Sequence, residues 1–321
     1  MTRETVERET GLLFGDLWSR YDDRLFKESV ELFERRWNEN GEAPDHFHGK
    51  RCLDAGCGGG RYSFAMARMG AAEVIGVDVG EEGLADARRR ADAIGASNLE
   101  FRKASALDLP FEDAEFDFVC CCGVLHHTPG VEQGLRECLR VLRPGGRCYL
   151  LLYGFGGLYW PLNLVTRPFA EALGKAEVDR CISAAGLAAN KRRTILDDLF
   201  VPILETYAVE RVEHLLSGAG FASWRRWSGG QNDHESDPGT LVEELRIRER
   251  VWDAGASSAP REAAAEIERR LAATTHEVIG AAEAVVARGA AGELTEEQVH
   301  EAIIGTGHHR LIAEKAPPDA S

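Results

Sequence analysis

The sequence has little positive charge. Its 38 lysine and arginine residues stand against 53 aspartate and glutamate residues, which gives a formal net charge of −15. Binding to nucleic acid, or to an anionic membrane surface, depends on clustered basic side chains. The charge therefore predicts that neither nucleic acid nor a membrane is a partner of this chain.

Cysteine patterns typical of metal centres or disulfide frameworks are missing. The 8 cysteines include three consecutive ones, and they do not form two matching C-x-x-C pairs. Most lie in apolar, strand-like segments, which is typical of free buried thiols in a reducing cytoplasm. No spacing of histidine, cysteine or acidic residues predicts a metal site.

Long uninterrupted apolar segments are also missing. The N-terminal sequence MTRETVERETG lacks the apolar core of a signal peptide. Residues 148–166 carry no charge, but they contain three glycines and a proline. They are therefore interpreted as a strand followed by a loop, and a cytoplasmic location is expected.

Strand-like and helix-like segments alternate from residue 50 onwards. Short apolar segments are typical of buried strands, and the longer amphipathic segments between them are typical of helices. This alternation predicts a doubly wound parallel sheet. The expected strands cover residues 50–55, 73–78, 99–104, 116–125 and 147–154, and the expected helices cover 60–69, 81–95 and 131–142.

The remaining segments predict further helices and two more strands. Apolar periodicity predicts a helix over 10–40, and helical insertions are expected over 155–206 and 240–304. Residues 222–230 and 308–315 are expected to be the last two strands. The sheet would then have seven mostly parallel strands, with helical insertions after the fifth strand and between the sixth and seventh.

A glycine cluster, Asp54-Ala55-Gly56-Cys57-Gly58-Gly59-Gly60, follows the first expected strand. Such a turn lets a ligand approach backbone N–H groups at the start of the next helix. Arg61 stands where a dinucleotide-binding turn has its third glycine, and the carboxylate of Asp54 would face a pyrophosphate. A ligand with a cationic amino group suits Asp54 better.

Asp78 ends the second expected strand, 22 residues after Gly56. An acid at this position can bind both hydroxyls of a ribose. This interpretation indicates an adenosine, which NAD and S-adenosylmethionine (SAM) share.

Two further blocks, SALDLPFEDAEFDFVCCCGVLHHTPG at 105–130 and LRECLRVLRPGGRCYLLL at 135–152, complete a pattern over residues 50–153. With it the chain resembles class I SAM-dependent methyltransferases, of the small-molecule type found in quinone and natural-product biosynthesis. The resemblance implies a Rossmann-like fold and SAM as the cofactor. It also implies transfer of the methyl group, by in-line attack in a closed pocket, to an oxygen or nitrogen atom of a small-molecule acceptor.

The resemblance also implies roles for individual residues. Gly56 and Gly58 would approach the methionine part of SAM, with Asp54 near its amino group, and Asp78 would hold the ribose hydroxyls.

Two more positions of the pattern would complete the cofactor site. Ser105 and Ala106 stand where the family often has Asp-Ala for the adenine amino group, so a weaker contact is expected there. Cys122 and Gly123, at the end of the fourth strand, would line the methyl-donor side.

His126 and His127 follow the fourth strand and are the candidates for a general base, because the pKa of histidine lies near neutrality. Aromatic side chains can hold the sulfonium cation, although ordinary packing is the simpler interpretation of each. The candidates are Trp18 and Tyr21 in the N-terminal helix and Tyr153 and Trp160 after the fifth strand.

Polar residues outside the core are candidates for acceptor contacts. The loop at 232–235 holds His234 among other polar residues, and a solvated loop is the preferred interpretation. Arg167, Asp197 and Asp198 lie in the first helical insertion, where the mixture of charges suits a polar acceptor.

The expected organisation has six segments. They are an N-terminal helical lid (1–49), a SAM-binding core (50–154), a helical acceptor lid (155–206), a continuation of the core with a helix and the sixth strand (207–238), a helical insertion (239–305) and the last strand with the tail (306–321). A homodimer interface is an alternative use of the insertion.

Three alternatives remain open at this point. A SAM enzyme of the same fold could transfer the aminocarboxypropyl group or catalyse a cyclisation. An NAD-dependent oxidoreductase is disfavoured by Asp54 and by the missing third glycine. A protein that binds SAM without turning it over is the third alternative.

Overall fold

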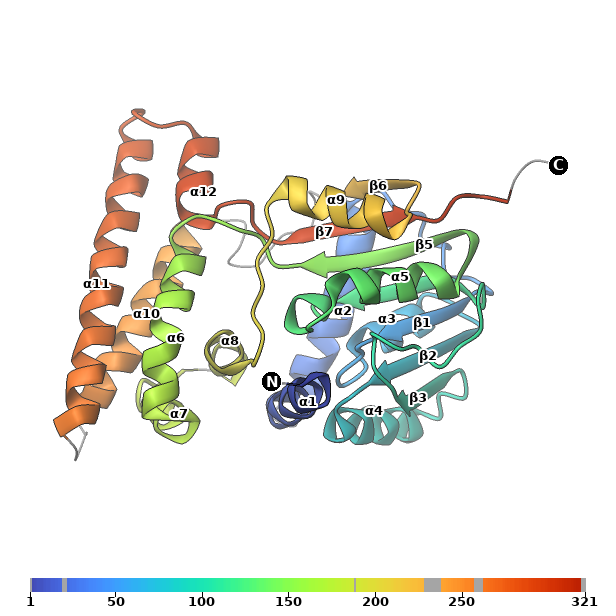
Figure 1. Cartoon of the computed structure of the whole chain (residues 1–321), viewed down its shortest axis with the longest axis horizontal. Coiled ribbons are helices and arrows are strands. Elements are labelled where there is room, and N and C mark those ends of the chain that lie inside the picture. The colour runs from blue at the N-terminus through green and yellow to red at the C-terminus, as the bar shows by residue number, and fades with distance from the viewer. Residues whose placement is uncertain (1, 19–21, 188, 228–237, 257–261, 319–321) are drawn as a thin grey trace. The chain divides into compact units, whose positions relative to one another are not determined.

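The computed structural model of the chain describes residues 2–18, 22–187, 189–227, 238–256 and 262–318 (Figure 1). These residues contain a seven-stranded sheet with the strand order β3-β2-β1-β4-β5-β7-β6. The strands are β1 (Arg51–Ala55), β2 (Glu73–Asp78), β3 (Leu99–Lys103), β4 (Phe116–Cys122), β5 (Leu142–Leu152), β6 (Ser223–Arg226) and β7 (His309–Glu314).

Strands β1 to β5 run parallel to one another, and β7 pairs antiparallel with both β5 and β6. The prediction of a mostly parallel, Rossmann-like sheet of seven strands is confirmed. The order reverses between β1 and β4, and ligands bind at such a switch point, beyond the carboxyl ends of the strands.

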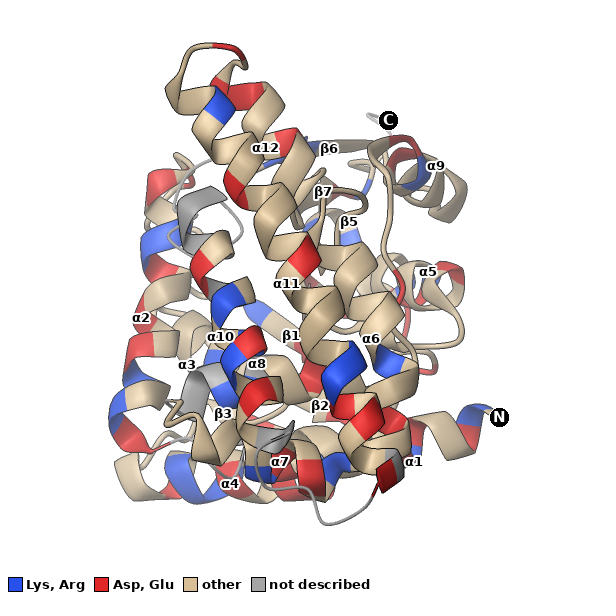
Figure 2. Cartoon of the chain, turned by 90° about the vertical axis from the view of Figure 1, so that its left-hand side faces the viewer, with Lys and Arg blue, Asp and Glu red and all other residues tan. Residues whose placement is uncertain are grey.

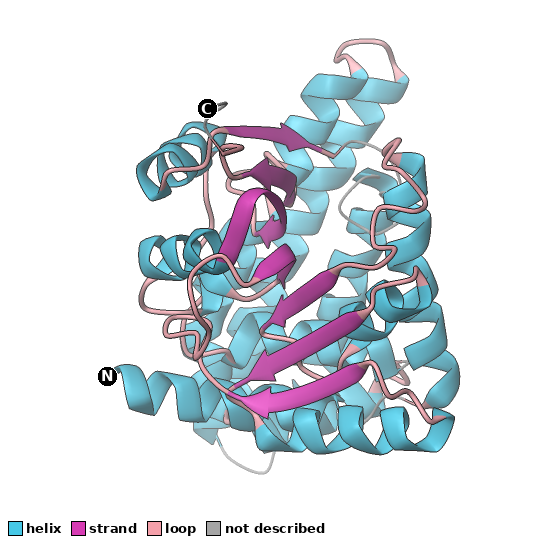
Figure 3. Ribbon diagram, turned by 90° about the vertical axis from the view of Figure 1, so that its right-hand side faces the viewer, coloured by secondary structure: helices cyan, strands magenta, loops and turns pink. Residues whose placement is uncertain are grey.

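Helices cover both faces of the sheet (Figure 3). Side chains of β4 alternate between the faces, as the period of a strand requires. Val119 and Cys121 pack with α5 (Val131–Val141) and α9 (Val209–Ala219). The alternate residues Phe118, Cys120 and Cys122 pack on the other face. Their neighbours there come from α2 (Asp23–Glu39), α3 (Arg61–Arg68) and α4 (Glu81–Ile94).

The chain divides into two compact units. The first contains the sheet and comprises Met1–Tyr153, Pro202–Gly230 and His308–Ser321, and the second comprises Gly154–Val201 and Gln231–Gly307. The second unit is helical. Its helices are α6 (Tyr159–Leu173), α7 (Lys175–Ala184), α8 (Ala189–Phe200), α10 (Pro238–Ala256), α11 (Glu262–Ala290) and α12 (Glu296–Ile304).

Charged residues on the helices of the first unit are mixed in sign. Basic and acidic positions are interspersed along α2 and α4 (Figure 2). Among the described residues, no helix has both the length and the hydropathy needed to cross a bilayer.

Three expectations about element boundaries were wrong. The N-terminal region forms two helices, α1 (Arg3–Trp18) and α2, and Asp22 caps α2 by accepting a hydrogen bond from the Leu25 N–H at 2.8 Å. Residues 143–146, which fall between an expected helix and the expected fifth strand, belong to β5, whose register against β4 shifts between Phe116 and Phe118. Strand β4 ends at Cys122, because a 3-10 turn follows at 125–127.

Candidate cofactor and acceptor site

The glycine turn after β1 bends the chain at Gly56, and its first N–H groups are bonded within the protein. Gly56 has a φ of +83°, and a Cβ atom there would lie 2.3 Å from a methyl group of Val124. The N–H groups of Gly56 and Cys57 both donate to the Val77 carbonyl, at 2.8 and 2.9 Å. Only glycine suits Gly56, because the conformation is left-handed and Val124 leaves no space for a side chain.

Asp54 is a buried acid in strand β1. Its carboxylate is 1% exposed, and one oxygen accepts a hydrogen bond from the Ser63 hydroxyl at 2.6 Å. Among the described residues, the other oxygen is buried without a hydrogen-bond partner beyond the weakly donating thiol of the adjacent Cys120. Burial raises the pKa of Asp54 to about 6. Because an unsatisfied buried acceptor is costly, this oxygen suits the amino group of a ligand.

Asp78 connects two turns. Its carboxylate accepts hydrogen bonds from the N–H groups of Gly58, at 2.8 Å, and Gly80, at 2.7 Å. Burial raises the pKa of Asp78, and these two backbone donors oppose that rise. Each carboxylate oxygen can still accept a second hydrogen bond, so a ribose hydroxyl can be bound in addition.

Helix α1 supplies a carboxylate that the sequence interpretation missed. The Ser105 hydroxyl donates to Glu7 Oε1 at 2.6 Å and accepts hydrogen bonds from Arg3 and from the Leu107 N–H, both at 3.1 Å. Arg3 also pairs with Glu7 at 2.9 Å. Ser105 therefore does not stand alone at the turn after β3, because an acidic side chain from α1 is bonded to it.

Helix α1 follows the same edge of the sheet further along. It packs against α4 (Figure 1), and a Cβ atom at Gly11 would lie 3.2 Å from the Gly80 Cα. Near its C-terminal end, the ring of Phe14 lies 5.5 Å from the ring of His127. The helix thus runs from the turn after β3, past the turn after β2, to the residues after β4.

Cys122 is the last residue of β4, and Gly123 follows it directly. The Cys122 thiol donates to the Tyr62 hydroxyl at 2.9 Å. Cys122 pairs in register with Leu151, and Leu151 pairs with Arg310, so the three side chains lie in one row on one face of the sheet. Burial raises the pKa of the Cys122 thiol, and three positive charges oppose that rise. They belong to Arg61, Arg310 and Arg36, the last two of which are 2% and 5% exposed.

His126 and His127 form part of the turn after β4, and both are buried. The His126 ring stacks on Tyr153, with centroids 3.8 Å apart, and Tyr153 stacks in turn on His308 at 4.5 Å. The His127 Nδ1 lies 2.9 Å from the Ile203 carbonyl oxygen, so His127 donates a proton to that carbonyl.

His126 differs from His127 in its hydrogen bonding. It is 0% exposed, and among the described residues neither of its ring nitrogens has a hydrogen-bond partner. Burial, together with the charges of His127 and His308, lowers the pKa of His126 well below its usual value. The lowered pKa favours the neutral form of the ring, in which one nitrogen carries a lone pair.

Comparisons with known proteins agree with this geometry. Residues 53–150 match the methyltransferase domain family. The chain is 29% identical over 183 residues to a ubiquinone biosynthesis O-methyltransferase of Acinetobacter baylyi, covering 53% of this chain and 76% of that protein. It is 37% identical over 152 residues to an enzyme of the same name from Pseudomonas syringae pv. tomato, covering 43% of this chain and 65% of that protein. The core of the chain is a class I SAM-dependent methyltransferase domain, and its cofactor is SAM.

A solved structure shares the fold of this chain across nearly its whole length. The [4+2]-cyclase SpnF matches with a TM-score of 0.51 at 20% identity, covering 98% of this chain and 97% of that one. This likeness concerns the fold alone.

The residues of the methyltransferase core fit SAM. Asp54 has an oxygen suited to the amino group, and Asp78 retains capacity for the ribose, whereas the N–H groups of Gly56 and Cys57 are already bonded to Val77. The roles of these residues remain predictions. The side chain of Trp18, all of Tyr21 and the loop at 232–235, with His234, lie outside the described residues.

Two charged residues that the sequence offered as acceptor contacts, Arg167 and Asp198, have partners within the second unit. Asp198 is buried, and its Oδ2 accepts hydrogen bonds from Arg248 and from the Tyr159 hydroxyl, both at 2.6 Å. Arg167 donates to the Asp198 carbonyl at 2.8 Å. Trp160 is also buried, in α6. Through these contacts Arg167 and Asp198 connect helices of the second unit, which the sequence could not indicate.

Proposed function

We propose that this chain transfers the methyl group of SAM to a hydroxyl oxygen of a small-molecule acceptor. The observation that carries the proposal is His126, a buried neutral imidazole without a partner among the described residues, four residues after Cys122 at the end of β4. Two relatives of the core bear the name O-methyltransferase, which further supports oxygen over nitrogen.

Bound SAM supplies an electrophilic methyl group, and the protein positions the acceptor hydroxyl in line with it. His126 accepts the hydroxyl proton as the oxygen forms its bond to carbon. The Tyr153 ring, 3.8 Å from the His126 ring, fixes the plane of the imidazole. His127 is held by the Ile203 carbonyl and orients the turn that carries His126.

We assign the cofactor contacts as follows. Asp54 binds the amino group, Gly56 and Gly58 approach the methionine chain, and Asp78 binds the ribose. The family often has an acid at the position of Ser105. Here Glu7, which is bonded to Ser105, serves as that acid and accepts a hydrogen bond from the adenine amino group. In this arrangement α1 covers the adenosine.

The arginines around Cys122 indicate the charge of the acceptor. The guanidinium of Arg310 lies on the same face as Cys122 and is almost fully buried, as is that of Arg36. Guanidinium groups bind carboxylates and phosphates in a fork geometry. We therefore propose an acceptor that carries an acidic group in addition to the reacting hydroxyl.

The test is calorimetric titration with SAM, S-adenosylhomocysteine and NADH, followed by turnover assays with hydroxylated arenes, with and without a carboxylate, and matched amines. S-adenosylhomocysteine as the product, with fastest turnover of the carboxylate-bearing arenes, supports the proposal. Methylthioadenosine as the product would mean aminocarboxypropyl transfer, and an isomerised acceptor with SAM unchanged would mean cyclisation. Methylation of the amines alone would overturn the choice of oxygen.

A further inference from the structure

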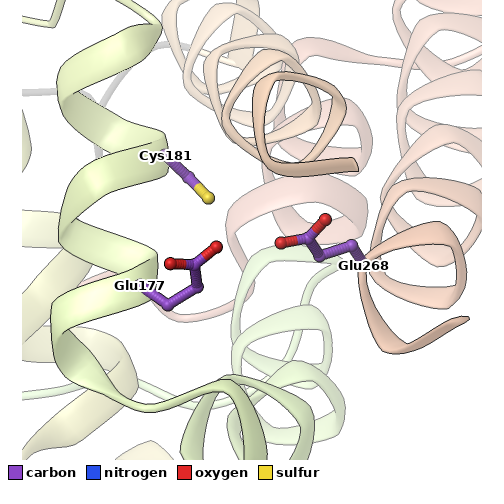
Figure 4. Close-up of side chains that lie close together, drawn as sticks. All are labelled: Glu177, Cys181 and Glu268. Carbon is purple, nitrogen blue, oxygen red and sulfur yellow. The ribbon is translucent and has the colours of Figure 1, made fainter. Parts of the chain in front are cut away.

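A second group of potential ligands lies in the helical unit, within residues 154–201 and 231–307. Glu177 and Cys181 project from the same side of α7, and Glu268 projects toward them from α11 (Figure 4). One ligand atom from each of the three residues lies within 4.8 Å of the other two. The spacing of four residues places Glu177 and Cys181 one helical turn apart, so both face the same point.

Glu268 requires a partner that the described residues do not supply. Its side chain is 0% exposed, and neither carboxylate oxygen has a hydrogen-bond partner among these residues. Burial and the neighbouring charge of Glu177 raise the pKa of Glu268. A buried carboxyl group without partners is costly, and a cation is one way to compensate it.

One positive charge is already nearby. Arg180 forms an ion pair with Glu177, and its Nη2 lies 3.9 Å from the Cys181 sulfur. The Arg180 side chain is 40% exposed and the Glu177 side chain 29% exposed, so both lie at the solvent side of the group. Arg180 can therefore turn outward, and it leaves the Glu268 oxygens without a hydrogen bond.

We propose that Glu177, Cys181 and Glu268 bind one zinc ion. Zinc accepts thiolate and carboxylate ligands together, with tetrahedral geometry. Ligand atoms around zinc lie roughly 3.5 Å apart, so the three side chains close inward by about 1 Å through rotamer changes. A water molecule entering beside Glu177 supplies the fourth ligand.

The ion would have a structural task. Residues 177 and 181 belong to the first chain segment of the helical unit and residue 268 to the second. These segments are separated in sequence by residues 202–230, which belong to the sheet unit. A zinc ion would link α7 to α11 and so stabilise the helical unit, because metal binding to the folded state adds to its stability.

The experiment uses the full chain after removal of metals by a chelator. Zinc is titrated in competition with a chromophoric chelator, and Co²⁺ is added as a spectroscopic substitute. We expect one zinc ion per chain, a zinc-dependent rise in Tm, and a thiolate-to-cobalt charge-transfer band. Loss of a mere outer-shell partner lowers metal affinity roughly 10- to 100-fold. Cys181→Ser and Glu268→Gln each remove a direct ligand, so each should lower zinc affinity at least about 10-fold.

Matched controls separate this site from other thiols and acids. Glu266→Gln changes an exposed glutamate of α11 that pairs with Arg269 and Arg270, and should leave zinc affinity unchanged. Cys138→Ala removes the central thiol of a buried group with Cys121 and Cys148, and should leave the cobalt band intact. Arg180→Gln should raise zinc affinity, because it frees Glu177.

The proposal is overturned if the wild-type chain binds no stoichiometric zinc, or if zinc binding survives in the Cys181→Ser, Glu268→Gln double variant. It is also overturned if Arg180→Gln weakens zinc binding in a chain whose circular dichroism is unchanged. Glu268→Gln is close to the native side chain in volume, and circular dichroism checks that it folds. A rise in its Tm with no zinc response in the wild type would mean that Glu268 is simply a buried, protonated acid.

Discussion

Replacement of Glu7 by alanine tests whether helix α1 recognises adenine. Glu7 is bonded to Ser105 at 2.6 Å, at the turn after β3. A hydrogen bond to a charged group contributes about 1.5–3 kcal/mol. The Glu7 side chain is 23% exposed, so the lower end of this range applies. A loss of about 1.5 kcal/mol corresponds to roughly a tenfold weaker affinity for S-adenosylhomocysteine.

A second ligand makes the test specific. S-inosylhomocysteine carries a carbonyl oxygen where adenine has its amino group, so it offers Glu7 no donor at that position. In calorimetric titrations, Glu7→Ala should weaken binding of the adenosyl ligand and leave binding of the inosyl ligand unchanged or stronger. Glu4→Ala, an exposed change in the same helix, is the control and should alter neither affinity.

Equal losses for the two ligands would refute the reasoning. That result would mean that Glu7 acts only by holding α1 in place, through its bonds to Arg3 and Ser105. Circular dichroism of the variant would show whether helix content has fallen. No loss for either ligand would remove Glu7 from the site altogether.

Three further predictions concern the core. Asp78→Ala should weaken SAM binding at least about tenfold. The change removes charged hydrogen bonds to the ribose and the hydrogen bonds that hold the turns at Gly58 and Gly80. Unchanged affinity in calorimetry would contradict the ribose assignment. His126→Ala should lower kcat by about 10²–10⁴ with S-adenosylhomocysteine affinity nearly intact; full turnover would locate the base elsewhere. Asp54→Asn should stabilise the ligand-free protein at pH 7 by up to about 3 kcal/mol, because the pKa of Asp54 is raised to about 6 when folded. Between about pH 4 and pH 6 the Asp54 carboxyl keeps its proton in the folded protein and loses it in the unfolded protein. The free energy of unfolding of the wild type therefore falls as the pH rises through this range. Urea melts at pH 4 and pH 7 should therefore differ between the two proteins only at pH 7, and SAM affinity should fall in the variant. Equal stability at both pH values would mean that Asp54 is not buried as described.

The Asp54 prediction illustrates a general feature of this site. Among the described residues, the Asp54 oxygen that suits the cofactor amino group is buried without a strong hydrogen-bond donor, which costs folding free energy. Replacing it should improve stability and impair binding, as is common where a site is prepared for a ligand.

Local patterns in the sequence were sufficient for the core. Strand β2 begins and ends where predicted, at Glu73 and Asp78, because a short apolar segment between polar ones has few alternatives. The glycine turn was also predicted from the sequence, because the left-handed conformation of Gly56 requires glycine. The boundary between α1 and α2 was missed, since continuous apolar periodicity masks a cap at Asp22.

The sequence by itself determined most strands of the core, the glycine turn and the family, because each can be recognised from residues close together in the chain. The tertiary structure alone decided which distant side chains meet. It brings Glu7 to Ser105 across 98 positions and sets Glu268 opposite Glu177 and Cys181. It also leaves His126 without a hydrogen-bond partner among the described residues. Such contacts depend on how helices pack and cross, and no local spacing in the sequence records that geometry.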